Sequence, residues 1–245
     1  LHLADNALIL GQRNAEWCGH GPVLEEDIAM ANIGLDLIGQ SRMLYQHAAT
    51  LINNTTEDEL AYFRDAQQFR NYVLLELPHR TAFAPSVATE RDYAVTITRN
   101  FLYSSLMHLV WGALQQSSDA QLAAIAAKSV KEVRYHLRHS TDWMLRLGDG
   151  TPESHARMQA ALNYLMPYTQ EFWAQPAIET VAIDAAELRL AWETSVKAVV
   201  LEATLSPASA DGYLTDGKNG KHSEHLSYLL MEMQSLARAH PGAVW

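Results

Sequence analysis

One stretch near the middle of the chain, from Ala120 to Leu147, constrains the fold more than any other. Its apolar residues recur every three or four positions, which is typical of one face of an α-helix. They are Leu122, Ile125, Ala126, Val130, Val133, Leu137 and Met144. Glu132 and His136 lie one turn apart on a neighbouring face. The stretch therefore predicts a long amphipathic helix that carries a carboxylate and an imidazole side by side.

The same periodicity extends over most of the chain and predicts an all-α protein. Glycine and proline residues mark where the helices end. The predicted helices span residues 5–17, 22–52, 57–77, 86–116, 120–147, 152–173, 184–205 and 222–240. Pro167 is expected to kink or divide the helix that contains it. Only Val181-Ala182-Ile183 resembles a strand, and three residues cannot form a sheet.

The length of 245 residues and a hydrophobic content of 48% allow one substantial core. We expect a single domain over residues 1–245, folded as a helical bundle. The long helices in about the first 150 residues would form the bundle, and the helices of about residues 151–245 would pack against it as C-terminal additions.

The charge and the cysteine content exclude several classes of function. Eighteen basic residues stand against 28 acidic ones, and the net charge of -10 argues against nucleic acid and anionic membranes as partners. No apolar run reaches the length of a membrane span. The single cysteine, Cys18, permits no disulfide within the chain and is expected to be a buried thiol. These features predict a soluble cytoplasmic protein.

The carboxylate and imidazole pair raises the question of a metal site. In four-helix di-iron proteins, two helices each supply a Glu-x-x-His pair and the other two each supply a carboxylate. The helix over 22–52 offers Asp36 within an apolar run, but the residue three positions later is Gly39. In the helix over 120–147, Glu132 is followed at that spacing by Tyr135, and His136 is preceded by Val133. Neither helix has a complete pair.

The remaining two helices of the expected bundle lack the acids that two iron ions require. No acidic residue occurs between Asp5 and Glu16, and none between Asp92 and Asp119. We therefore expect no metal, no cofactor and no catalytic residue in this chain. Asp36, Glu132 and His136 are expected to form a vestigial polar cluster. The pairs His136/His139 and His222/His225 have a metal-ligand spacing, but such pairs also arise by chance among eleven histidines.

Four segments resemble one protein family. They read AEWCGHGP at 15–22, DIAMANIGLDLIGQ at 27–40, KEVRYHLR at 131–138 and GKHSEHL at 220–226. Together they are similar to the PaaC subunits of bacterial phenylacetyl-CoA epoxidases, which are multicomponent monooxygenases. The resemblance extends over nearly the whole chain, and it implies a ferritin-like fold.

The resemblance also implies a supporting role in a complex. A homologous subunit, PaaA, would carry the di-iron centre and bind the coenzyme A thioester. Further components would include a small subunit and a reductase, which uses flavin and an iron–sulfur centre to pass on electrons from NADPH. The assembled enzyme would use oxygen to form an epoxide on the aromatic ring of phenylacetyl-CoA. No catalytic residue is transferred to this chain by the resemblance.

Three functions remain open from the sequence. The first is a non-catalytic subunit that supports the catalytic one, and its exposed aromatic residues, such as Trp17 or Trp245, are candidate contacts. The second is an oxygenase whose metal site has fewer ligands or lies elsewhere in the bundle, and is built from Asp36, Glu132 and His136. The third is a ferritin-like binding protein that acts alone, as a homodimer.

Overall fold

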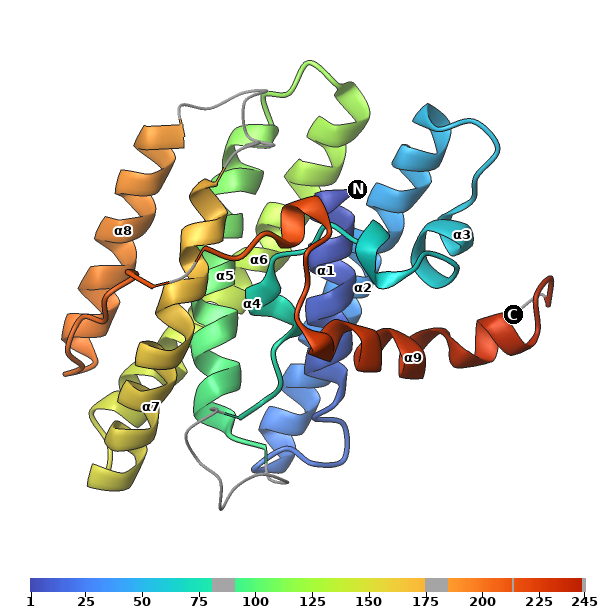
Figure 1. The fold of residues 1–245 in the computed structure, drawn as a ribbon. Coiled ribbons are helices and arrows are strands. Elements are labelled where there is room, and N and C mark those ends of the chain that lie inside the picture. The colour runs from blue at the N-terminus through green and yellow to red at the C-terminus, as the bar shows by residue number, and fades with distance from the viewer. Residues whose placement is uncertain (81–90, 175–184, 213, 244–245) are drawn as a thin grey trace. The chain divides into compact units, whose positions relative to one another are not determined.

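The structure is a computed structural model that describes residues 1–80, 91–174, 185–212 and 214–243 (Figure 1). These residues form helices joined by turns, with no β-strand among them, which confirms the all-α prediction and suits a ferritin-like helical fold. The helices are α1 (His2–Ala15), α2 (Leu24–Leu51), α3 (Glu57–Tyr62), α4 (Val73–Glu76), α5 (Tyr93–Leu114), α6 (Ala120–Gly148), α7 (Pro152–Leu165), α8 (Ala185–Glu202) and α9 (Glu224–Ala239). Short 3-10 helices span Ala66–Gln68, Met166–Trp173 and Gly217–Asn219.

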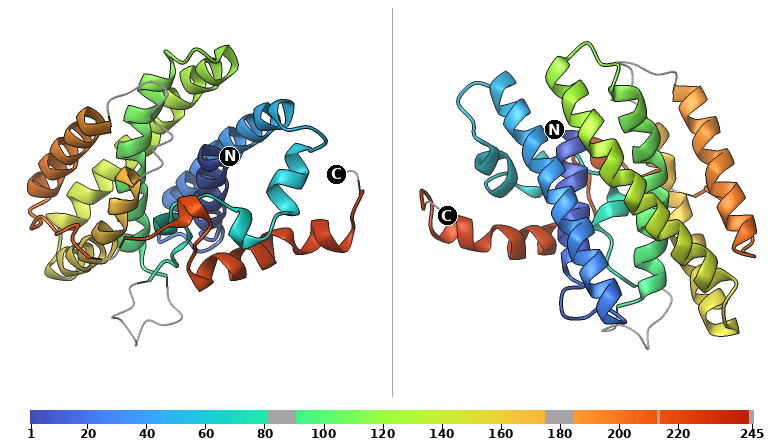
Figure 2. Two further views of the ribbon diagram at one scale, coloured as in Figure 1. Left: turned by 45° about the horizontal axis from the view of Figure 1, so that its top comes forward. Right: turned by 180° about the vertical axis from the view of Figure 1, so that it is seen from behind.

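The chain forms two compact units. Unit 1 combines Leu1–Leu77 with Thr215–Trp245, and unit 2 is Pro78–Leu214. Unit 1 thus joins two segments that are far apart in the sequence, as the blue-to-cyan and red ribbons show (Figure 2). None of the helices in the described residues is long and apolar enough to cross a membrane. The prediction of one domain over the whole chain stays a prediction.

Unit 1 is built around the hairpin of α1 and α2. Glycines let the two helices approach closely, because a Cβ atom on Gly11 would lie 3.3 Å from the carbonyl oxygen of Gly34. The buried face of α2 includes Met30, Ile33 and Leu37, and these apolar residues form the core of the unit. The α4 helix packs against α1 and the α3 helix against α2, and the C-terminal α9 packs against α3, α4 and the 3-10 helix Ala66–Gln68.

Unit 2 is built around the hairpin of α5 and α6, against which α7 and α8 pack. The α5 helix is buried around most of its circumference, as its apolar composition predicts. Its N-cap residue is Asp92, whose side chain accepts a hydrogen bond from the backbone amide of Ala94. The indole of Trp192 on α8 donates a hydrogen bond of 3.1 Å to the carbonyl oxygen of Leu102.

Several predicted boundaries agree with the structure. The helix predicted over 152–173 divides near Pro167, where α7 ends at Leu165 and a 3-10 helix follows, so this prediction is confirmed. One predicted boundary differs, since α5 begins at Tyr93 and the sequence predicted a helix from residue 86. Residues 86–90 lie outside the described part of the chain, as do Val181-Ala182-Ile183.

The continuous helix predicted over 57–77 is wrong. The structure contains α3, a 3-10 turn and α4, separated by extended backbone. Tertiary hydrogen bonds are the reason for this difference. Extended backbone presents the amide of Arg70 to the side chain of Asp5 at 2.8 Å, and the amide of Tyr72 to that of Asn6 at 2.8 Å. A helix would turn these amides toward its own carbonyl groups.

Candidate functional site

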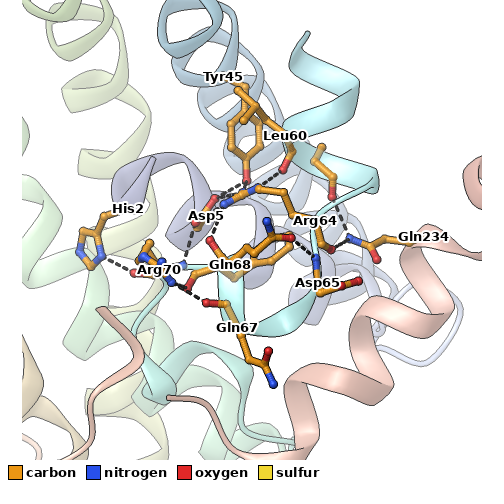
Figure 3. Close-up of polar contacts among 12 residues, drawn as sticks. His2, Asp5, Tyr45, Leu60, Arg64, Asp65, Gln67, Gln68, Arg70 and Gln234 are labelled. Carbon is orange, nitrogen blue, oxygen red and sulfur yellow. Dashed lines mark hydrogen bonds and ion pairs between the residues drawn. The ribbon is translucent and has the colours of Figure 1, made fainter. Parts of the chain in front are cut away.

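The most elaborate polar site of unit 1 is centred on Asp5, which lies in the first turn of α1 and is 0% exposed (Figure 3). The hydroxyl of Tyr45 donates a hydrogen bond of 2.5 Å to its Oδ1 atom. Both terminal nitrogens of Arg64 also donate to this carboxylate, and the backbone amide of Arg70 does so at 2.8 Å. Four donors therefore surround the two oxygens, and the buried charge of Asp5 is fully compensated.

Arg64 uses its remaining donors on the Tyr45 hydroxyl, at 3.0 Å, and on two backbone carbonyl groups. Its Nε donates to the carbonyl oxygen of Leu60 at 2.5 Å, and its Nη1 to that of Gln68 at 2.9 Å. The guanidinium carbon lies 4.2 Å from the centre of the Phe69 ring, a cation–π contact. Arg64 thus holds the turn between α3 and the following 3-10 helix onto α1.

This environment shifts the ionisation of the groups around Asp5. Burial and the neighbouring Asp5 carboxylate raise the pKa of the Tyr45 hydroxyl well above its usual value. Burial alone would lower the pKa of Arg64, but the hydrogen bonds and the charge of Asp5 raise it above its usual value. Both shifts favour the protonated hydroxyl and the charged guanidinium, which are the forms that bind the Asp5 carboxylate.

His2 lies beside this ion pair in a neutral form. Burial, assisted by the positive charge of Lys218, lowers its pKa to about 3. Its Nε2 lies 3.0 Å from the side-chain amide nitrogen of Asn6, and its Nδ1 contacts the backbone carbonyl oxygen of Arg70. The carbonyl can only accept, so Nδ1 carries the proton and Nε2 accepts from Asn6. His2 is a satisfied core histidine.

A second buried carboxylate, Glu76 in α4, is also 0% exposed. Its Oε2 atom accepts hydrogen bonds from the side-chain amide of Asn71 at 2.9 Å and from Nδ1 of His222 at 2.8 Å. Its Oε1 atom accepts from the backbone amide of Ser223 at 2.5 Å. Arg13 donates to the backbone carbonyl oxygen of the same residue. Glu76 therefore connects α1, α4 and the segment that begins α9.

The three residues predicted from the sequence as a polar cluster lie on two helices. Glu132 and His136 are one turn apart on α6 of unit 2, and His136 is buried. Lys128, one turn before, lies 3.8 Å from the Glu132 carboxylate. Asp36 lies on α2 of unit 1 and is half-buried. The grouping of all three stays a prediction.

Two other predictions about single residues are wrong. Cys18 is an exposed thiol rather than a buried one, because it lies in the turn after α1. Trp17, suggested as an exposed contact, is 4% exposed and belongs to the core. Trp245, the other suggested contact, lies outside the described residues.

The predicted histidine pair His222/His225 does not act as a unit in the structure. Both ring nitrogens of His222 are engaged, Nδ1 by Glu76 and Nε2 by the carbonyl oxygen of Phe69 at 3.0 Å. Each nitrogen therefore faces an oxygen atom of the chain itself rather than an open position for a metal ion.

A di-iron centre needs carboxylate oxygens that are free to bind metal. The oxygens of Asp5 and Glu76 are engaged by donors of the chain itself. Among the described residues of either unit, no three side chains of histidine, cysteine, aspartate or glutamate form a group that could hold a metal ion. These donor sets do not fit a di-iron centre. The prediction that the chain carries no cofactor remains a prediction.

The sequence contained a signal for these two carboxylates that our interpretation missed. Asp5 follows Leu3-Ala4, and Glu76 follows Val73-Leu74-Leu75, so each acid interrupts an apolar run. The same reasoning singled out Asp36, which is less buried than either. An acid within an apolar run thus indicates burial, and it does not by itself indicate a ligand.

The protein is therefore an α-helical protein in which two buried carboxylates have a structural role. Arginine, tyrosine and histidine side chains of the chain itself bind them. The family model described as "Phenylacetic acid catabolic protein" matches residues 1–245, and the chain belongs to this family. The chain is 45% identical over 251 aligned residues to the C component of the 1,2-phenylacetyl-CoA epoxidase of Escherichia coli (strain K12). That alignment covers 100% of this chain and 97% of the relative. The resemblance inferred from the four segments is confirmed.

Proposed function

We propose that this chain is a non-catalytic structural subunit of a phenylacetyl-CoA epoxidase complex in the aerobic degradation of phenylacetate. It would bind the homologous di-iron subunit, PaaA, and hold it in an active form. The family match over residues 1–245 and the relative named as a component of such an epoxidase support this proposal.

The observation that carries the proposal is the engagement of the Asp5 and Glu76 carboxylates. In unit 1, these two fully buried acids accept hydrogen bonds from Arg64, Tyr45, Asn71 and His222, and from backbone amides. These hydrogen bonds engage both oxygens of each carboxylate, so the oxygens are not available to bind iron. A chain that uses its buried acids in this way is suited to support a catalytic neighbour.

The proposal also assigns the cofactors of the complex. The di-iron centre would belong to the catalytic subunit, and flavin, an iron–sulfur centre and NADPH would belong to the reductase component. We place the complex in the cytoplasm, which suits a chain with a single, exposed thiol.

The first experiment is to co-express this chain with the catalytic subunit and to separate the products by size-exclusion chromatography. Co-elution, with iron bound in the complex but absent from this chain purified alone, is the expected result. Omission of this chain from the reconstituted enzyme is expected to abolish turnover of phenylacetyl-CoA. A chain that elutes alone, or a complex that turns over equally well without it, would overturn the proposal.

A second experiment separates the structural role from an oxygenase with its own metal site. The substitutions Asp36→Asn and Glu132→Gln remove two of the carboxylates that such a site would require, while keeping the side-chain shapes. Unchanged turnover and unchanged iron content of the complex are expected. A loss of iron from a complex that still assembles would favour the oxygenase instead.

A further inference from the structure

One face of α2 carries a row of exposed apolar residues. They are Leu24, Ile28, Leu35 and Ile38, with exposed fractions of 72%, 52%, 66% and 41%. Ala31 lies between them on the same face and is half-buried. We call these five residues the α2 seam. The helix is seen along its length in the right-hand view of Figure 2.

The spacing of the α2 seam indicates what would cover it. Its positions 24, 28, 31, 35 and 38 alternate in steps of four and three. This is the repeat by which one α-helix receives the side chains of another in a coiled coil. A flat apolar surface would require no such repeat, so the spacing favours a partner helix.

The α2 seam leads into a groove of unit 1. This groove lies between α2, α3 and α9, and it has a volume of about 1110 Å³. Ile38 and Arg42 on α2 and Met233 and Leu236 on α9 are among its lining residues. A helix about 10 Å wide that rises 1.5 Å per residue would fill this volume with roughly nine residues. The groove can therefore hold the end of a helix that lies along the seam.

Two polar atoms in the lining of the groove have no hydrogen-bond partner in the structure. They are the hydroxyl of Ser41, whose side chain is on a residue only 1% exposed, and the Oε2 atom of Glu57. A buried polar group without a partner is costly. Both atoms are buried within unit 1 itself, so a donor would reach them only if the side chains that line the groove moved.

The charge around the groove indicates which hydrogen-bond donors a bound helix would carry. Glu57, Asp58 and Glu59 contribute three carboxylates, against the single guanidinium of Arg42. Arg42 already donates to Oε1 of Glu57 at 3.2 Å, which leaves an excess of negative charge. Lysine or arginine side chains on the occupant would complement it. A second copy of this chain has a net charge of -10 and so carries no overall excess of basic groups to complement the groove.

We propose that the α2 seam and the adjoining groove form the docking surface for an amphipathic helix of another protein, with apolar residues at alternating spacings of three and four and with basic residues at the end that enters the groove. This inference rests on the proposed function, in which the helix belongs to the catalytic subunit of the epoxidase. It adds the surface and the chemistry by which the two subunits recognise each other.

The test compares two substitutions at equally exposed leucines. Leu35 on the α2 seam and Leu190 on α8 are both 66% exposed. Leu35→Glu is expected to weaken binding of the catalytic subunit by roughly a hundredfold in Kd, whereas Leu190→Glu leaves it unchanged. Calorimetry measures the Kd, and circular dichroism confirms that both variants are folded. Equal affinities for the two variants would overturn the proposal.

A third variant tests the charge of the groove. Asp58→Lys is expected to lower the affinity and to reduce its dependence on salt, because it removes attraction to basic residues. Unchanged salt dependence would contradict the basic character of the helix. If Leu35→Glu instead converts a dimer of this chain alone into a monomer, the occupant is a second copy and the proposal fails. Failure of the unsubstituted chain to bind the catalytic subunit would overturn the proposed function itself.

Discussion

The carboxylate of Asp5 and the guanidinium of Arg64 form a buried ion pair that joins α1 to the turn after α3. Every oxygen of the pair is engaged, and the Tyr45 hydroxyl contacts both partners. Such a pair need not add stability relative to an apolar one, but removal of one partner leaves an uncompensated charge in the core.

The substitution Asp5→Asn is therefore expected to lower the free energy of unfolding by about 3–5 kcal/mol, since it leaves Arg64 buried without its counter-charge. Tyr45→Phe is milder, at about 1.5–3 kcal/mol, because it removes two hydrogen bonds, one to Asp5 and one from Arg64, but no charge. Urea unfolding measures both. Glu193→Gln is the control. It disrupts an ion pair with Arg189 that is half exposed, and it is expected to cost less than about 1 kcal/mol. A cost for Asp5→Asn no larger than that of the control would contradict this account.

Glu76→Gln is expected to release the segment before α9. In the native protein the carboxylate holds His222 and Ser223, next to the exposed side chain of Lys221. Loss of hydrogen bonds to a buried charge, at about 1.5–3 kcal/mol, should raise the rate of tryptic cleavage after Lys221 roughly tenfold or more. Cleavage after Lys197, in α8, provides the internal control and should not change. Equal protection of Lys221 in both proteins would show that Glu76 does not anchor this segment.

Gly220 and Gly242 offer a matched test of close packing. Both have a φ of 83°, a left-handed conformation. A Cβ atom on Gly220 would lie 2.2 Å from the backbone oxygen of Gln67, whereas one on Gly242 would meet no atom within 4 Å. Gly242→Ala is expected to cost about 1 kcal/mol, and Gly220→Ala clearly more, because it adds a backbone clash to the same strain. Thermal unfolding compares them, and equal midpoints would exclude the clash.

The neutral state of His2 predicts a dependence of stability on pH. The folded-state pKa of about 3 lies below the unfolded value of 6.5, so the unfolded chain binds the proton more readily. The contribution is fully present above pH 6.5 and is lost as the pH falls toward 3. Between pH 7 and pH 5 this residue should remove about 2 kcal/mol of stability. His2→Gln should lack this part of the pH dependence in urea unfolding. An identical pH profile for the variant would exclude His2 as its source.

The periodicity of apolar residues predicted most of the helices because it depends only on which face of each helix is buried. The 57–77 region shows where that reasoning fails. Its apolar pattern suits a helix. However, the side chains of Asp5 and Asn6, about 65 residues earlier, accept hydrogen bonds from two of its backbone amides, and these bonds stabilise extended backbone instead. Local pattern contains no information about so distant a partner.

The candidate site was predictable only in part, for a related reason. The family resemblance and the lack of complete ligand pairs follow from the sequence alone. The roles of Asp5 and Glu76 depend on the partners Arg64 and His222, which the fold brings together across large sequence separations. Trp17 and Cys18 are adjacent in the sequence but differ in exposure, because a turn directs one side chain inward and the other outward.

The composition of unit 1 from residues 1–77 and 215–245 has a consequence for its synthesis. A ribosome that adds about 5–20 residues per second needs roughly 7–28 s to pass from Leu77 to Thr215. During that interval the nascent chain already contains Glu76, but His222 and Ser223 have not yet been translated. The Glu76 carboxylate therefore lacks two of its hydrogen-bond donors until the last part of the chain has been synthesised.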